Sequence, residues 1–100
     1  MKENLLQIIN HYGVLPQLKQ FNEEAYELIE AIIRKEIEYQ FCETTVKMDR
    51  ENLKHIAEEI ADVLNMVEQF KEYYHIDGND ILRIMNEKID RTIDRMKEEK

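Results

Sequence analysis

The stretch "NEEAYELIEA" (residues 22–31) decides the fold, because it mixes glutamates with apolar residues at helical spacing. Apolar residues recur at three- and four-residue steps on both sides of it, from Leu18 toward Phe41. A second stretch of the same kind runs from about Arg50 to Tyr74. The sequence therefore predicts two long amphipathic helices, and with two glycines and one proline in 100 residues it offers little material for β-hairpins.

Shorter helices are predicted on either side of this pair. Residues 3–12 form an amphipathic segment that ends at Gly13, and Pro16 suits the first turn of the next helix. After the turn "HIDGND", Asp77 or Asn79 can cap a last helix that runs toward the C-terminus. The third helix has Asp49 as its candidate N-cap, after a break in the pattern over "CETTVKMD".

No linker, repeat or low-complexity tract interrupts residues 1–100. We therefore expect a single all-α domain, a four-helix bundle of two long antiparallel helices with shorter N- and C-terminal helices. A chain of this size hides only roughly 60–70% of its unfolded surface when it folds alone. Two long apolar faces then favour a homodimer or homotetramer.

The net charge of −8 is spread along the chain, which gives no footprint for binding a nucleic-acid polymer or an anionic membrane. No segment is apolar enough for a membrane span or a signal peptide, and the single Cys42 suits a reducing compartment. The expected protein is cytoplasmic. It would repel a bare polyanion unless a cation came with it.

Two acidic pairs have the same position relative to their apolar faces. At about 100° per residue, Glu24 and Glu27 lie near 300° and 240° from Phe21, and Glu59 and Asp62 lie at the same angles from Ile56. In an antiparallel pair, both acidic pairs then flank one edge of the same seam. Measured from the expected helix ends, the first pair lies about five residues further from the connection, roughly 7 Å.

Four carboxylates at one partly buried edge repel one another unless a cation neutralises them. Mg²⁺, with Mn²⁺ as a substitute, fits because both are hard ions that take oxygen ligands. Residues three apart on a helix can reach the same ion. The alternative is that each pair is ordinary solvated helix surface, which the matched angles make less attractive.

The order of three segments resembles a known family. "EEAYE" (23–27) followed by "EIAD" (59–62) resembles the EExxE…ExxD signature of the MazG-like, all-α nucleoside triphosphate pyrophosphohydrolases, which include dimeric dUTPases and dCTP pyrophosphatases. "HYGVLPQLKQFNEEAYELIEAI" (11–32), "IAEEIADVLNMVEQF" (56–70) and "NEKIDRTIDRM" (86–96) are similar to segments of small, phage-type members. The 31 residues between Glu27 and Glu59 are somewhat more than members usually have.

The resemblance implies Mg²⁺-dependent hydrolysis of a ribo- or deoxyribonucleoside triphosphate to the monophosphate and pyrophosphate, in a nucleotide-pool house-cleaning role. It implies that the metal ligands are Glu24, Glu27, Glu59 and Asp62. Glu23 matches the first acid of the signature, with a catalytic role in orienting a ligand or the attacking water.

Further residues are candidates for binding the substrate. Lys88, Arg91 and Arg95 share one side of the last helix and suit phosphate oxygens, although surface ion pairs such as Glu87 with Arg91 are an equal alternative. Asn65 follows Asp62 by one helical step and suits sugar or phosphate.

Gln17 matches a polar position in the family's first segment, with a base or sugar contact as the functional interpretation and an exposed first-turn residue as the other. The competing hypothesis for the whole chain is a non-catalytic acidic module for oligomerisation or protein interaction, which would not depend on divalent cations.

Overall fold

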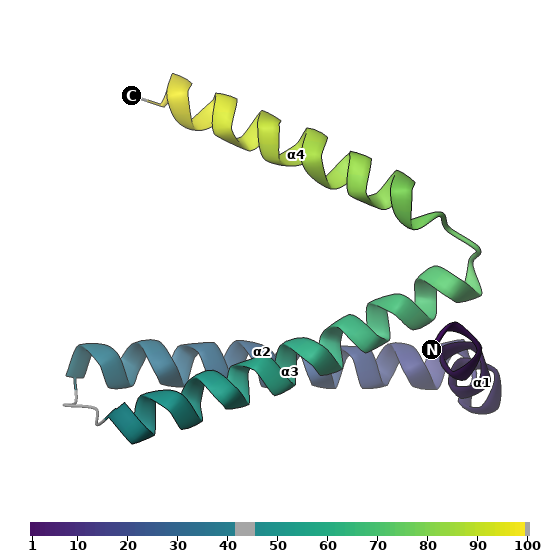
Figure 1. Cartoon of the computed structure of the whole chain (residues 1–100), viewed down its shortest axis with the longest axis horizontal. Helices are drawn as coiled ribbons and strands as arrows, with labels where there is room; N and C mark the ends of the chain where they lie inside the picture. The colour runs from purple at the N-terminus through teal and green to yellow at the C-terminus, as the bar shows by residue number, and fades with distance from the viewer. Residues whose placement is uncertain (42–45, 100) are drawn as a thin grey trace.

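The computed structural model describes residues 1–41 and 46–99, and it is helical apart from short turns. Four helices follow in the order α1 (Lys2–Tyr12), α2 (Val14–Phe41), α3 (Val46–Tyr73) and α4 (Gly78–Glu98). The all-α prediction and the expected order of one short, two long and one intermediate helix are confirmed. Figure 1 shows α2 and α3 lying side by side and antiparallel.

The start of the chain is shaped by Gly13. Its backbone has a φ of 94°, in the left-handed region that glycine adopts without steric cost, and its N–H donates to the carbonyl of Ile9 at 2.8 Å. This ends α1 and lets α2 begin at once in a new direction. Pro16 lies in the first turn of α2, where the missing N–H removes no helical hydrogen bond.

The start of α3 differs from the prediction. The helix begins at Val46, so Asp49 is not its N-cap and lies in its first turn instead. Lys35 of α2 forms an ion pair with Asp49, which engages the carboxylate between the two long helices. The predicted break is thus shorter than expected, and its part over residues 42–45 lies outside the described residues.

The turn before α4 confirms one of the two predicted caps. The side chain of Asp77 accepts a hydrogen bond from the backbone N–H of Asn79 at 2.9 Å, so Asp77 is the N-cap. Just before it, His75 adopts a positive φ of 55° and the N–H of Ile76 donates to the carbonyl of Lys71 at 3.0 Å. This backbone turns α4 away from α3.

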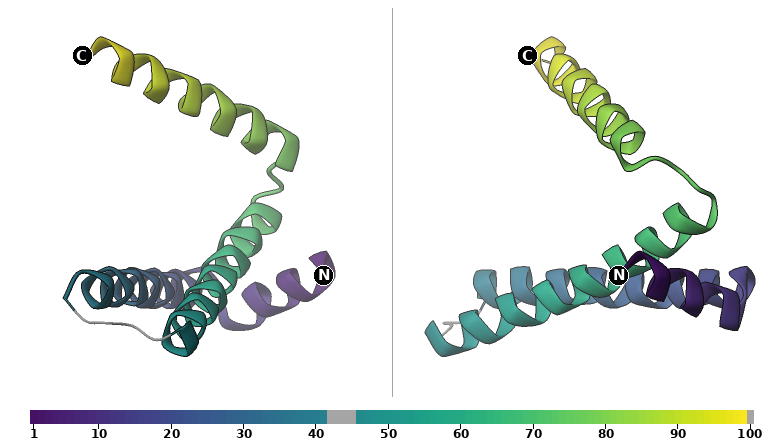
Figure 2. Two further views of the ribbon diagram at one scale, coloured as in Figure 1. Left: turned by 60° about the vertical axis from the view of Figure 1, so that its left-hand side comes forward. Right: turned by 45° about the vertical axis from the view of Figure 1, so that its right-hand side comes forward.

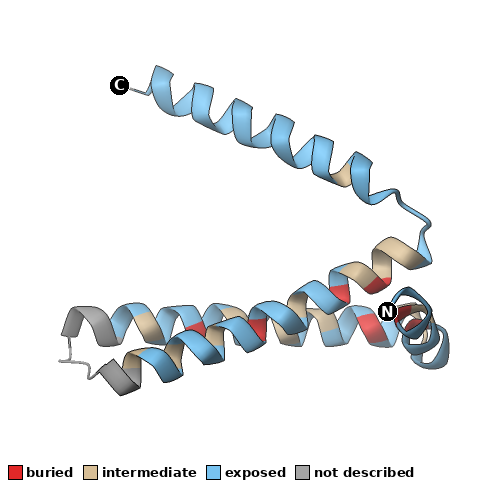
Figure 3. Cartoon of the chain, viewed as in Figure 1, coloured by how far each residue is buried: buried red, intermediate tan, exposed pale blue. Residues whose placement is uncertain are grey.

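The core lies where α1 crosses the α2–α3 pair. Leu5 and Ile9 of α1 are buried, and the rings of Phe21 and Phe70 meet edge to face with their centres 6.0 Å apart. Figure 3 shows that buried residues belong to the first three helices. Among the described residues, no side chain of α4 is buried.

The fourth helix stands apart from the other three in every view (Figures 1 and 2). The radius of gyration is 17.5 Å, whereas a compact domain of this length has about 13 Å. A four-helix set is therefore present, but within one chain only α1, α2 and α3 pack extensively on one another. None of the described helices is long and apolar enough to cross a membrane.

Candidate active site

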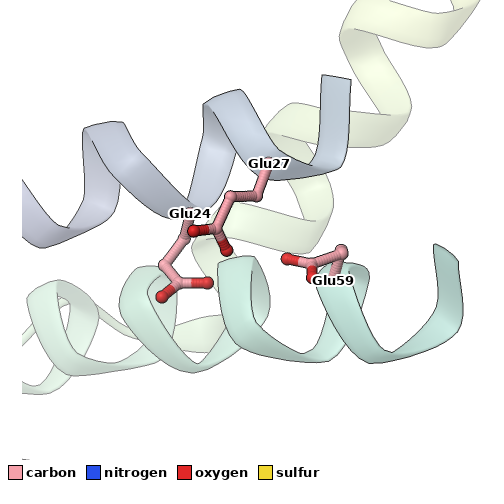
Figure 4. A group of neighbouring side chains, drawn as sticks. All are labelled: Glu24, Glu27 and Glu59. Carbon is pink, nitrogen blue, oxygen red and sulfur yellow. The ribbon is translucent and has the colours of Figure 1, made fainter. Parts of the chain in front are cut away.

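Three glutamates from the two long helices converge on one space. One carboxylate oxygen from each of Glu24, Glu27 and Glu59 lies within 4.8 Å of the others. Figure 4 shows Glu24 and Glu27 pointing from α2 toward α3, and Glu59 pointing back toward them. Glu59 is only 8% exposed, Glu24 is half-buried and Glu27 is exposed. The cluster therefore has a closed side on α3 and an open side toward solvent.

The helix ends explain why the two acidic pairs face each other. Glu27 precedes the end of α2 by 14 residues, and Glu59 follows the start of α3 by 13. The predicted offset of about five residues is wrong because it assumed that α3 starts near Arg50 rather than at Val46. The earlier start brings the two pairs to the same level.

The acids act on one another electrostatically across the seam. Burial raises the pKa of Glu24 above its ordinary 4.5, a hydrogen bond from Gln20 opposes this, and the charge of Asp62 adds to it. The pKa of Glu27 is also raised, first by desolvation and then by the charge of Glu59. Asp62 therefore belongs to this electrostatic group, although it is exposed and outside the tight cluster of three.

Two carboxylate oxygens in this cluster have no hydrogen-bond partner. They are Oε2 of Glu24 and Oε2 of Glu59, both buried, and no other buried side-chain oxygen or nitrogen of the described residues lacks one. A buried ionised carboxylate without a partner is costly. Oxygen atoms of this kind are the ligands that Mg²⁺ and Mn²⁺ take, so the donor set fits such an ion.

The other oxygen of each of these two carboxylates has a polar neighbour on its own helix, and for Glu24 this neighbour forms a hydrogen bond. Nε2 of Gln20 donates to Oε1 of Glu24 at 2.7 Å, and Nε2 of His55 lies 3.8 Å from Oε1 of Glu59. Neither Gln20 nor His55 was predicted as a site residue. Their common position, four residues before an acidic ligand candidate, is a sequence signal that could have identified both.

The remaining polar candidates on the long helices lie in different surroundings. Glu23 and Asn65 are exposed, and the charge of Glu23 contributes to the raised pKa of Glu27. Gln17 is only 7% exposed, and its Nε2 donates to Oε1 of Gln69 at 2.8 Å. The interpretation of Gln17 as an exposed first-turn residue is therefore wrong, and no local pattern in the sequence indicates its partner on α3.

The three basic candidates are exposed along one side of α4. Lys88, Arg91 and Arg95 surround a surface hollow with Thr92, whose hydroxyl accepts a hydrogen bond from Arg95 at 3.3 Å. In the described part of the chain none of these three basic residues forms an ion pair.

The suggested partner of Arg91, Glu87, is instead bound to Arg83 at 3.1 Å. Because α4 stands apart from α2 and α3, a single chain does not bring its basic residues to the acidic cluster.

A family profile matches most of the chain. The profile of the MazG nucleotide pyrophosphohydrolase domain matches residues 14–97, which cover all of α2 and α3 and nearly all of α4. No curated protein and no solved structure matches the chain significantly.

Proposed function

The chain belongs to the MazG nucleotide pyrophosphohydrolase family, and we propose that it hydrolyses a nucleoside triphosphate to the monophosphate and pyrophosphate in a Mg²⁺-dependent reaction. The reaction adds one water across the bond between the α- and β-phosphates, so it needs no further reactant. Such an activity fits a house-cleaning role in the cytoplasmic nucleotide pool.

The observation that carries the proposal is the pair of unpartnered buried oxygens, Oε2 of Glu24 and Oε2 of Glu59, which come from facing helices. With Glu27 and Asp62 they would hold Mg²⁺ or Mn²⁺. When bound, such an ion lowers the pKa of a coordinated water and offsets charge on phosphate oxygens. The acidic cluster would then attract a triphosphate–metal complex, although the chain itself is strongly acidic.

Glu23 is the proposed catalytic carboxylate. It lies next to Glu24 in sequence and is exposed, on the same open side of α2 as Glu27. A carboxylate at this position can accept a hydrogen bond from the attacking water and orient it. Glu23 therefore complements the ligands without occupying the seam between the helices.

The basic residues of α4 would bind phosphate oxygens that the acidic cluster cannot. Because Lys88, Arg91 and Arg95 do not reach the cluster of their own chain, we propose that they serve the cluster of a neighbouring copy. Asn65, exposed on α3, is the proposed contact for sugar or phosphate. Gln17 would contact a base or sugar only if its hydrogen bond to Gln69 opened.

We propose a homodimer or homotetramer because one chain leaves much apolar surface uncovered. Tyr26, Ile29, Ile33 and Ile37 form an exposed stripe on α2 around a surface hollow. On α4, leucine, isoleucine and methionine side chains are exposed along the whole helix: Leu82, Ile84, Met85, Ile89, Ile93 and Met96. A second copy would offer further apolar faces to cover these stripes, and the basic side of its α4 would be opposite in charge to the acidic cluster.

The same apolar faces favour the competing hypothesis of a non-catalytic oligomerisation module. That hypothesis explains the exposed stripes equally well, but it gives no reason for carboxylates on two facing helices each to have a buried oxygen without a partner. The two hypotheses differ in whether divalent cations matter.

The test is incubation with a panel of ribo- and deoxyribonucleoside triphosphates and Mg²⁺, with the products resolved by chromatography. We expect monophosphate and pyrophosphate from at least one nucleotide, and no turnover with a chelator. The substitutions Glu59→Gln and Asp62→Asn should each lower the rate about 100-fold or more, since a loss of about 3 kcal/mol of transition-state stabilisation has that effect.

Glu58→Gln, which removes an exposed carboxylate next to Glu59, is the matched control and should keep the wild-type rate. Intact nucleotides throughout the panel would contradict the proposed function. Full activity in both Glu59→Gln and Asp62→Asn would contradict the proposed ligands.

A further inference from the structure

Gln20 holds one oxygen of a proposed metal ligand from outside the cluster. It lies one helical turn before Glu24 on α2, and its Nε2 donates to Oε1 of Glu24 at 2.7 Å. The other oxygen, Oε2, is left buried and without a partner. Oε1 of Glu24 is thus held by a hydrogen bond, whereas Oε2 is not.

On α3, Glu59 also has a polar neighbour one helical turn before it, at a longer distance than a hydrogen bond. His55 lies one turn before Glu59, with Nε2 at 3.8 Å from Oε1, and Oε2 of Glu59 is buried without a partner. Each of the two carboxylates thus has one oxygen with a polar neighbour four residues earlier on its own helix and one buried oxygen without a partner. Both carboxylates belong to the cluster in which one oxygen of each of Glu24, Glu27 and Glu59 lies within 4.8 Å of the others.

We propose that Gln20 is a positioning residue, which fixes the carboxylate of Glu24 so that Oε2 binds the divalent ion. This inference rests on the proposed metal site. A glutamate has three side-chain torsions, and a hydrogen bond to one oxygen restricts them before the ion arrives. Residues that hold metal ligands in this way typically change the metal affinity 10- to 100-fold when they are removed.

The chemistry of an amide suits this role. The NH₂ group of Gln20 donates to the carboxylate without carrying a positive charge, so it does not compete with the ion for the negative charge of Glu24. A lysine at this position would hold the oxygen but would also repel the cation. Gln20 is exposed and is not one of the buried residues of the core, which separates its proposed role from core packing.

The test is Mn²⁺ binding to Gln20→Met, measured by the electron paramagnetic resonance signal of the free ion. Methionine keeps the length and helix propensity of glutamine but has no N–H donor. We expect about tenfold weaker Mn²⁺ binding than in the wild type, with an unchanged melting temperature in the presence of a chelator. Gln7→Met, which alters an exposed glutamine of α1, is the control and should bind Mn²⁺ as the wild type does.

Activity gives a second measure that a merely structural role would not produce. In Gln20→Met the Mg²⁺ concentration for half-maximal rate should rise about tenfold, while kcat at saturating Mg²⁺ stays within about twofold of the wild type. Wild-type Mn²⁺ affinity in Gln20→Met would overturn the role of Gln20 and leave the metal site intact. A wild-type protein that binds no Mn²⁺ would overturn the proposed function itself, and this inference with it.

Discussion

The α2–α3 pair and α4 are both amphipathic, but only the pair finds cover within the chain. Packing of α2 on α3 buries one side of each helix and brings Glu24, Glu27 and Glu59 together. Helix α4 has no buried residue and keeps its basic side exposed to solvent. One chain thus brings together the acidic residues of the proposed site but leaves the basic side of α4 apart from them.

The largest effect on activity is expected from a substitution of Arg95, a basic residue of α4. If Arg95 binds a phosphate oxygen, Arg95→Ala should lower kcat/KM by about 10- to 100-fold, the equivalent of about 1.5–3 kcal/mol for a charge-assisted hydrogen bond. Its Mn²⁺ affinity should not change, because α4 does not contact the acidic cluster of its own chain. Lys97→Ala, which removes another exposed basic residue of α4, is the control.

A complementation experiment then tests whether α4 serves a neighbouring copy. Co-expressed Glu59→Gln and Arg95→Ala chains should recover activity, because a mixed oligomer can combine the intact acidic cluster of one chain with the intact α4 of the other. No recovery in a mixed oligomer, with Arg95→Ala alone impaired, would mean that α4 serves its own chain. A mass of 12.1 kDa for the wild type in light scattering would contradict any oligomer.

A smaller effect, on stability, is expected from a substitution of Gln17, whose side chain is hydrogen-bonded to Gln69 of α3. Gln17→Leu leaves Oε1 of Gln69 buried without its donor, and Gln69 is only 4% exposed. We expect a loss of about 1–3 kcal/mol in the free energy of unfolding, measured by urea denaturation. The double variant Gln17→Leu/Gln69→Leu should recover much of this loss, because both polar partners are then absent.

The same pair of variants separates the two roles considered for Gln17. If the double variant is stable and keeps the wild-type KM, Gln17 fixes α2 against α3 and does not bind substrate. A raised KM in a stable double variant would support the base or sugar contact.

The sequence predicted the helices well because their periodicity and turn residues are local signals. Gly13 and Asp77 lie where a C-cap and an N-cap are expected, and both confirm the predicted helix limits. Asp49 misled the prediction, because an acidic residue suits both an N-cap and a first turn. Its ion pair with Lys35 depends on α2–α3 packing, which a pattern within one helix does not contain.

The candidate site was only partly predictable for the same reason. Matched helical angles placed Glu24, Glu27, Glu59 and Asp62 on one edge, and the structure brings the first three together. Angles do not say which oxygen stays without a partner, so the holding role of Gln20 was missed. Helical angles also do not predict the position of α4, because this helix does not pack extensively on the rest of its own chain.

The proposed binding of a divalent ion by the acidic cluster is tested most directly by the melting temperature. It is measured as a function of pH, once with Mg²⁺ and once with a chelator. The pKa values of Glu24 and Glu27 are raised in the folded state, so the metal-free fold binds more protons than the unfolded chain just above pH 4.5. Their contribution to stability is therefore lost as the pH rises through that range.

Mg²⁺ binds the ionised carboxylates, so it should raise the melting temperature most near pH 8 and progressively less toward about pH 5. The variant Glu24→Gln/Glu27→Gln, which removes both titrating groups, should show neither the pH dependence due to them nor the Mg²⁺ effect. A wild-type melting temperature that Mg²⁺ leaves unchanged at every pH would contradict the account.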